Sequence, residues 1–226
     1  MNVHSIRASV HGRYVVDPPL RTSKPVPLIV GFHGYAERAE HMLDALRKIR
    51  GERPWLLVSV QALNRFYTRA NDVVANWMTR EDRELAIADN LAYIAAVVAA
   101  IRSDYSCTDT VVYAGFSQGV AMAYRAAAFV HEYDRSVPAA AGAIMLAGDV
   151  PPDVVPRMAS LPPVLIGRGA TDHWYTEEKA SGDLALFDAA GISPHVHVFD
   201  DGHVWHESFM TAAAEFLDGI LKPWLT

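Results

Sequence analysis

Short apolar runs alternate with helix-like patterns along the chain from residue 28 to its end. The runs lie at residues 28–32, 55–60, 110–114, 139–146, 163–167 and 195–199. Buried strands separated by helices cannot be joined as hairpins, so such strands pair in parallel and need helices on both faces of the sheet. The alternation therefore predicts an α/β fold with a mainly parallel central sheet, in a single domain over residues 1–226.

The segments between these runs have helical character, at residues 40–49, 79–101, 118–132, 177–190 and 205–221. The clearest one carries apolar residues at helical spacing on one face: Ile87, Leu91, Ile94, Val98 and Ile101. Before that face, Thr79 to Asp82 has the spacing of a capping box. Residues 61–79 are predicted to form a long polar loop. Residues 3–16 alternate loosely around His11-Gly12, which predicts an N-terminal hairpin.

Charge and cysteine content exclude some classes of function. Asp and Glu number 26 against 20 Lys and Arg, so the formal net charge is −6, which argues against sequence-independent nucleic-acid binding. The single cysteine, Cys107, allows no internal disulfide, as is typical of a reducing compartment. The N-terminus has no signal-like apolar core, and the apolar stretch 91–101 is too short to cross a bilayer. We expect a cytoplasmic protein without membrane insertion.

A nucleophile motif follows the run at 110–114. It reads Gly115-Phe116-Ser117-Gln118-Gly119, which is G-x-S-x-G between a predicted strand and a predicted helix. A serine on such a sharp turn needs small neighbours two places away, and glycine supplies them on both sides. The N-terminus of the following helix favours developing negative charge. We expect Ser117 to be a nucleophile; the alternative is a tight turn whose serine caps the helix.

A serine hydroxyl needs a base, and two histidines follow the run at 195–199. We favour His203, because Gly202 permits a turn before it, whereas His206 falls in the first turn of the final helix. An H-x-x-H pair can also bind metal, but no H-E-x-x-H motif or Cys/His cluster accompanies it. We therefore expect neither a metal nor another cofactor.

The acid that orients the base is expected in the loop after residues 163–167. Asp172 lies there, 31 residues before His203, which leaves room for one helix and one strand. Asp149, in the loop after the preceding strand, is the alternative acid. The alternative interpretation of Asp172 is a cap on the next helix.

A tetrahedral intermediate needs fixed N–H donors for its oxyanion. We expect the backbone N–H groups of Gln118, directly after the nucleophile, and of Tyr35, in the loop after residues 28–32. His33, in the same loop, is expected to be a structural residue beneath it. Large apolar side chains on the predicted loops are candidates for substrate binding: Trp77, Met78, Trp174 and Trp205.

Taken together, these motifs resemble the α/β-hydrolase fold and, within it, the phospholipase/carboxylesterase family that includes the acyl-protein thioesterases. The resemblance covers residues 26–221 and rests on five short segments: His33-Gly34, residues 115–119, residues 169–172, Gly202-His203 and Asn76-Trp77-Met78. It implies a Ser117–His203–Asp172 triad, Tyr35 and Gln118 as oxyanion donors, and no separate cap domain.

This sequence departs from the family pattern at two positions. Ala36 stands where the family has the second glycine of H-G-x-G, and Asp149 places a carboxylate where the family has an uncharged loop. The function that the resemblance implies is hydrolysis of a small-molecule carboxylic ester or thioester through an acyl-enzyme on Ser117. Two alternatives are a non-catalytic protein of this fold that binds a small ligand, and a peptidase that uses the same triad.

Overall fold

The computed structural model describes residues 1–19 and 24–222. A central sheet has the strand order β1-β3-β2-β6-β7-β8-β9; β1 is antiparallel to β3, and the other five pairs are parallel. Its strands are β1 (Arg13–Asp17), β2 (Val26–Phe32), β3 (Leu56–Gln61), β6 (Cys107–Phe116), β7 (Ala140–Leu146), β8 (Val164–Gly169) and β9 (His195–Phe199). The mainly parallel sheet that the sequence predicts is confirmed.

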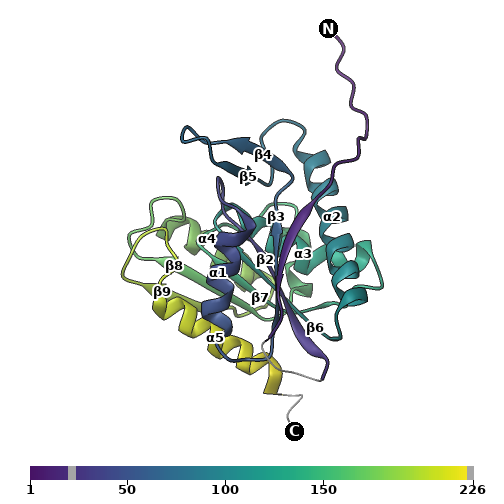
Figure 1. Ribbon diagram of the computed structural model, residues 1–226. Helices are drawn as coiled ribbons and strands as arrows, with labels where there is room; N and C mark the ends of the chain where they lie inside the picture. The colour runs from purple at the N-terminus through teal and green to yellow at the C-terminus, as the bar shows by residue number, and fades with distance from the viewer. Residues whose placement is uncertain (20–23, 223–226) are drawn as a thin grey trace.

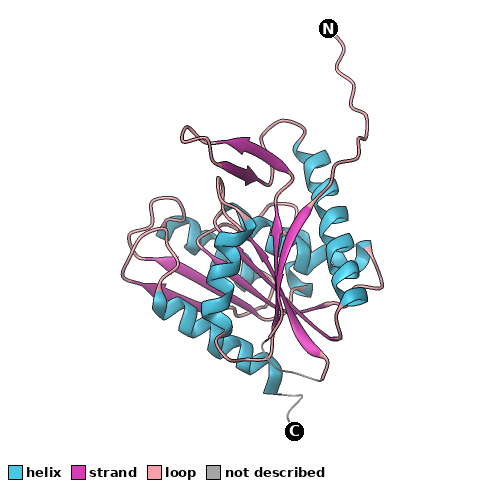
Figure 2. Cartoon of the chain, viewed as in Figure 1, coloured by secondary structure: helices cyan, strands magenta, loops and turns pink. Residues whose placement is uncertain are grey.

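Helices cover both faces of this sheet (Figures 1 and 2). They are α1 (Ala39–Arg50), α2 (Arg83–Asp104), α3 (Gln118–Tyr133), α4 (Glu177–Ala189) and α5 (Glu207–Leu221), with a short 3₁₀ helix, η1 (Val155–Ser160). Helices α1 and α5 contact each other on one face, and α2 contacts α3 on the other. Helix α4 joins the α3 side, where the rings of Tyr124 and Phe187 lie 6.4 Å apart.

The central strands are buried on both faces, which explains why they appear in the sequence as continuous apolar runs. Every residue of β2 and of β3 is buried, and β6 is buried from Thr110 onward. Because the parallel strands point the same way, the loops that follow them meet at one edge. That edge is where ligands bind in open α/β sheets.

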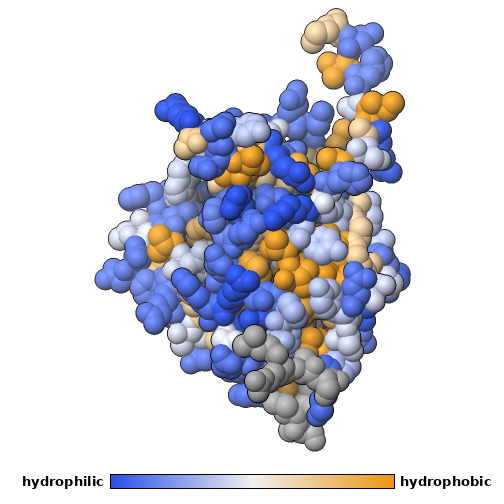
Figure 3. Space-filling model, viewed as in Figure 1, coloured by the Kyte–Doolittle hydropathy of each residue, from blue (hydrophilic) through white to orange (hydrophobic). Residues whose placement is uncertain are grey.

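The N-terminal hairpin predicted from residues 3–16 is wrong. Residues 1–12 are exposed and have no regular secondary structure, and the N-terminal end of this segment extends away from the body (Figures 1 and 3). Strand β1 instead pairs with the edge of β3, in register from Arg13 with Gln61 to Asp17 with Leu57. An isolated two-stranded hairpin is marginally stable, whereas the edge of a large sheet offers ready backbone partners. Asp17 also bonds Arg47 of α1 at 2.8 Å.

The long polar loop predicted over residues 61–79 contains a second, two-stranded sheet. Strands β4 (Asn64–Tyr67) and β5 (Val73–Asn76) pair antiparallel, and a bridge between Glu37 and Ala75 ties the hairpin to the loop after β2. Three of the four β4 residues are exposed. Strand β4 therefore carries no alternation of buried and exposed residues that would mark it in the sequence.

Helix α2 begins later than predicted and without the expected capping box. Asp82, its N-cap residue, has a left-handed φ of 46° and makes no side-chain cap bond; the Thr79 hydroxyl instead accepts from the N–H of Glu81 at 3.2 Å. The whole helix spans 22 residues, so its length and hydropathy alone would allow it to cross a membrane. Its apolar face, which includes Ile94 and Val98, is buried inside the domain, as in the core helix of a globular protein.

Gly119 sets how closely α3 packs on β2. A Cβ built on Gly119 would overlap the backbone carbonyl of Phe32, so we expect Gly119→Ala to lower the free energy of unfolding by about 3 kcal/mol or more. Gly182→Ala in α4 is the matched control, because its Cβ would meet nothing within 4 Å. That change should stabilise the helix by about 1 kcal/mol. Urea denaturation of both variants measures the difference, and equal stabilities would contradict the packing argument.

Candidate active site

Ser117 lies on a strained turn between β6 and α3. Its backbone has φ 53° and ψ −120°, a conformation that side-chain-bearing residues rarely adopt. A hydrogen bond holds the turn, since the N–H of Ser117 donates to the carbonyl of Leu146 at 2.9 Å. The backbones of Gly115 and Gly119 also approach so closely that a Cβ on Gly115 would overlap Gly119. The two glycines thus allow a sharp turn at the edge where the strands end.

Asp172 and His203 form a direct pair. The Nδ1 atom of His203 lies 2.8 Å from Oδ2 of Asp172, whose side chain is fully buried. The other oxygen, Oδ1, accepts the N–H groups of Trp174 at 2.7 Å and Tyr175 at 3.0 Å. One oxygen of Asp172 therefore caps the turn before α4, and the other binds the imidazole of His203.

The Asp172 carboxylate is kept charged. Burial opposes its ionisation, but the N–H donors of Tyr175 and Trp174 and the bond to His203 outweigh that cost, so the pKa of Asp172 lies below its ordinary value. An ionised carboxylate accepts hydrogen bonds only. The shared proton therefore belongs to Nδ1 of the imidazole, and Nε2 is left as the basic atom.

The loops that carry Asp172 and His203 are bonded to each other through their backbones. Thr171 donates its N–H to the carbonyl of Asp201 at 3.0 Å, and Ala170 donates to that of Phe199 at 2.7 Å. The His203 ring also packs on Phe116, with ring centroids 5.0 Å apart. Phe116 directly precedes Ser117, so the loops bearing Ser117, Asp172 and His203 lie together at one edge of the sheet.

The alternative base and the alternative acid have other partners. His206 is the N-cap of α5, where Nδ1 accepts the N–H of Ser208 at 3.2 Å, and its ring stacks on Phe199 at 5.0 Å. Asp149 is exposed, and its Oδ2 lies 3.1 Å from Nζ of Lys179. The structure thus brings His203 to Asp172 rather than to Asp149.

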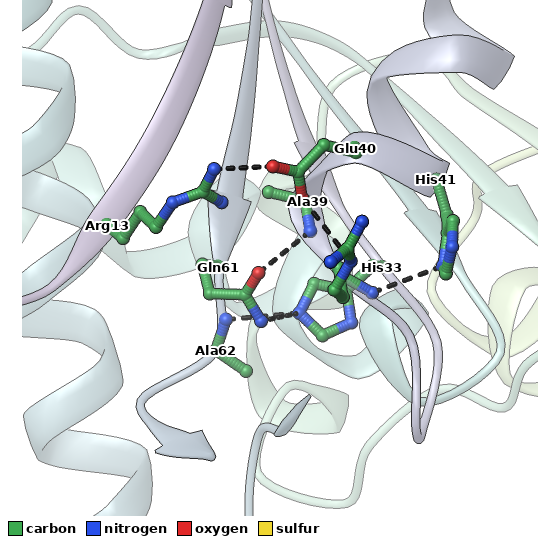
Figure 4. Close-up of polar contacts among 8 residues, drawn as sticks. Arg13, His33, Ala39, Glu40, His41, Gln61 and Ala62 are labelled. Atoms are coloured by element: carbon green, nitrogen blue, oxygen red, sulfur yellow. Dashed lines mark hydrogen bonds and ion pairs between the residues drawn. The ribbon is translucent and has the colours of Figure 1, made fainter. Parts of the chain in front are cut away.

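His33 lies beneath the loop that follows β2, in the polar cluster drawn in Figure 4. Its Nδ1 lies 2.7 Å from the carbonyl of Gly34, and its Nε2 accepts the N–H of Ala62 at 3.1 Å. The ring is fully buried. Burial lowers the pKa of His33 to about 4, although the bond to Gly34 opposes the shift, so the ring is neutral near pH 7.

The loop after β2 is bound to the β4–β5 hairpin. Ala36 donates its N–H to the carbonyl of Ala75 at 3.0 Å, and Glu37 accepts the N–H of Gly34 at 2.7 Å through Oε2. Ala36 itself has φ 58°, the left-handed conformation that glycine adopts freely. The left-handed turn therefore forms without the second glycine, at a steric cost of roughly 1–2 kcal/mol.

The Gln118 side chain joins the first turn of α3 to the segment around Trp77. Its Oε1 accepts the N–H of Trp77 at 2.9 Å, and its Nε2 donates to the carbonyl of Met78 at 3.2 Å. The indole Nε1 of Trp77 donates to the carbonyl of His33 at 2.8 Å. Trp77 therefore cross-links the loop after β2 and the start of α3, where the predicted oxyanion donors lie.

The four candidate substrate-binding side chains occupy different places. Trp77 is fully buried beneath the edge, and Trp205 packs on Phe116 with ring centroids 5.6 Å apart. Met78 and Trp174 line an open cleft next to Ser117. Tyr35 is exposed and its ring packs on Phe66 of β4 at 5.6 Å.

That cleft has a volume of about 590 Å³. Besides the groups already named, its walls carry three basic side chains that the sequence analysis did not single out, Arg80, Arg83 and Lys179. The available signal was the three-residue spacing of Arg80 and Arg83, which places them on one face at the start of the predicted helix. In the described part of the chain, no group of three or more His, Cys, Asp or Glu side chains is placed to hold a metal ion.

Solved structures share this architecture. The crystal structure of esterase PE8 superposes with a TM-score of 0.72 at 21% identity, covering 94% of this chain and 100% of that one. The chain has the α/β-hydrolase fold. Zea mays acyl-protein thioesterase 2 matches with a TM-score of 0.69 at 19% identity, covering 93% of this chain and 100% of that chain. A Bacillus cereus carboxylesterase matches with a TM-score of 0.70 at 17% identity, covering 92% of this chain and 94% of that chain.

The similarity is one of structure rather than of sequence. No family model matches this α/β-hydrolase-fold chain, and no curated protein sequence matches it.

His33 should make stability depend on pH. The unfolded chain binds a proton at this ring below about pH 6.5, whereas the folded protein binds it only near pH 4. The free energy of unfolding should therefore fall by about 2–3 kcal/mol as the pH falls from 7.5 to 4.5. Urea denaturation of the wild type and of His33→Gln at both pH values isolates this contribution, since other groups titrate in both proteins. An equal loss in the two proteins would exclude His33 as its source.

Proposed function

We propose that the protein is a serine hydrolase that cleaves carboxylic esters or thioesters through an acyl-enzyme on Ser117. The observation that carries this proposal is the 2.8 Å pair between His203 Nδ1 and Asp172 Oδ2, on loops at the edge that holds the strained serine turn. The esterase and thioesterase activities of the structural neighbours favour the same reaction class. The proposed substrate is a small molecule, and the proposed setting is the cytoplasm.

In the first half-reaction, Ser117 Oγ attacks the substrate carbonyl while His203 Nε2 takes the hydroxyl proton. The carbonyl oxygen becomes an oxyanion, for which we propose the backbone N–H groups of Gln118 and Tyr35 as donors. When the tetrahedral intermediate collapses, the bond to the alcohol or thiol breaks, and His203 returns its proton to that leaving group. The acyl group stays on Ser117.

In the second half-reaction, His203 takes a proton from a water molecule, which attacks the acyl-enzyme carbonyl. Collapse of this second intermediate releases the carboxylic acid and restores the Ser117 hydroxyl with the proton from His203. Asp172 holds the imidazole in the tautomer that leaves Nε2 free to act as a base, and it stabilises the imidazolium in both halves. The buried Trp77 supports the donor loops, while Met78 and Trp174 are proposed to contact the substrate.

Labelling with a fluorophosphonate tests the nucleophile. Ser117 Oγ should bond to phosphorus with loss of fluoride, giving one adduct per chain that mass spectrometry maps to residue 117. Ser117→Ala should take no label and should lower kcat for a p-nitrophenyl ester by about 10⁴ to 10⁶. A folded wild type that neither takes the label nor cleaves the ester would favour the non-catalytic ligand-binding alternative.

Substitution of the acid tests the orienting role. Asp172→Asn should lower kcat by about 10⁴, because an amide that donates to Nδ1 favours the wrong imidazole tautomer. Asp149→Asn, the matched change at the alternative acid, should cost far less. If Asp149→Asn lowered kcat by about 10⁴ while Asp172→Asn stayed active, the acid would be Asp149 instead. If the wild type also cleaved amide substrates, that result would support the peptidase alternative.

A further inference from the structure

The residues that line the cleft next to Ser117 indicate which kind of acyl group the substrate carries. We propose that the cleft accepts an acyl chain that ends in an anion, as in the half-ester or half-thioester of a dicarboxylic acid. This inference rests on the proposed function and specifies the substrate class of the same site. Arg80 and Arg83 are the groups proposed to bind the distal anion.

Two acidic residues at or next to the cleft wall form their ion pairs with groups other than these arginines. Asp149, which lines the cleft, is paired with Lys179 at 3.1 Å. Asp153, directly after the cleft residue Pro152, accepts two bonds of 2.7 Å from the buried Arg125. Burial opposes the ionisation of Asp153, but the bonds to Arg125 and, more weakly, the charge of Arg83 lower its pKa. Among the residues that the structure describes, neither Arg80 nor Arg83 forms an ion pair.

Three helices add to this positive character with their N-terminal ends. Arg83 is the first residue of α2, Gln118 is the first of α3, and Lys179 lies in the first turn of α4; all three line the cleft. The N-terminal end of a helix carries a partial positive charge, which favours anions nearby. The cleft is thus locally basic in a chain whose formal net charge is −6.

The position of the base assigns the cleft to the acyl side of the scissile bond. His203 has to protonate the leaving group, so the alcohol or thiol lies on the side of His203. The cleft is lined by Ser117 and Gln118, whereas His203 is absent from its walls within the described residues. Met78 and Trp174 add apolar surface to the same walls, which suits a chain of methylene groups.

The kinetic test compares p-nitrophenyl hydrogen adipate with p-nitrophenyl heptanoate, a neutral ester of similar length. After correction for their alkaline hydrolysis rates, we expect kcat/KM to favour the anionic ester by about tenfold at low salt. The double variant Arg80→Gln/Arg83→Gln should bring that ratio close to one. High salt should also lower the ratio in the wild type, because exposed charges are screened.

Arg135→Gln is the matched control, since Arg135 is exposed in the loop between α3 and β7, at the opposite edge of the sheet. It should keep the wild-type ratio. A wild-type ratio near one that the double variant does not change would overturn the anionic-acyl inference, while hydrolysis that depends on Ser117 would leave the proposed function intact. Absence of both hydrolysis and labelling would remove the proposed function and this inference with it.

A binding measurement separates recognition from chemistry. In the Ser117→Ala protein, adipate should raise the melting temperature more than hexanoate at equal concentration, because only adipate keeps an anion for the arginines after the scissile carboxylate is placed. Adding Arg80→Gln/Arg83→Gln should abolish the difference. Equal shifts from the two acids in the Ser117→Ala protein would count against the inference whatever the kinetics show.

Discussion

The close packing of α3 on β2 is the constraint on which the site depends. Only a residue without a side chain fits at Gly119, because the carbonyl of Phe32 occupies the space where a Cβ would lie. This contact fixes the start of α3, so the chain must turn sharply at Ser117 to enter the helix, with φ 53°. The packing of β6 between the buried strands β2 and β7 offsets the cost of that conformation. The turn places Ser117 at the edge of the sheet.

The remaining parts of the site are held by hydrogen bonds between loops. The Asp172 and His203 loops share two backbone bonds, and the loop after β2 is joined to α3 through Trp77, whose indole donates to His33 and whose N–H donates to Gln118. Each loop therefore has a partner other than the substrate. These bonds hold the proposed oxyanion donors and the proposed base in place without a substrate, which is the condition for electrostatic stabilisation of an oxyanion.

The sequence predicts the elements whose signals are local. Central strands such as β2 and β3 were visible because both faces are covered, and the Ser117 turn was visible because both of its glycines lie two residues from the serine. The β4–β5 hairpin and the pairing of β1 with β3 were missed, since their partners are distant or their residues exposed. The burial of Trp77 was missed for a related reason, because its indole bonds a carbonyl 44 residues away.

The fold determines where the serine turn and the Asp172–His203 pair lie, but it does not determine which side chains line the cleft. The serine turn and the Asp172–His203 pair lie on loops that follow sheet strands, so any chain with this sheet order can place them at one edge. The cleft walls come mainly from the segment 78–83 and the loop 147–152. Within the first of these, Arg80 and Arg83 are exposed and therefore bear little on the packing of the central strands. Proteins of low sequence identity can therefore share a fold while their substrates differ. The charges of Arg80 and Arg83 belong to the part that is free to vary, so they carry information about the substrate that the fold does not.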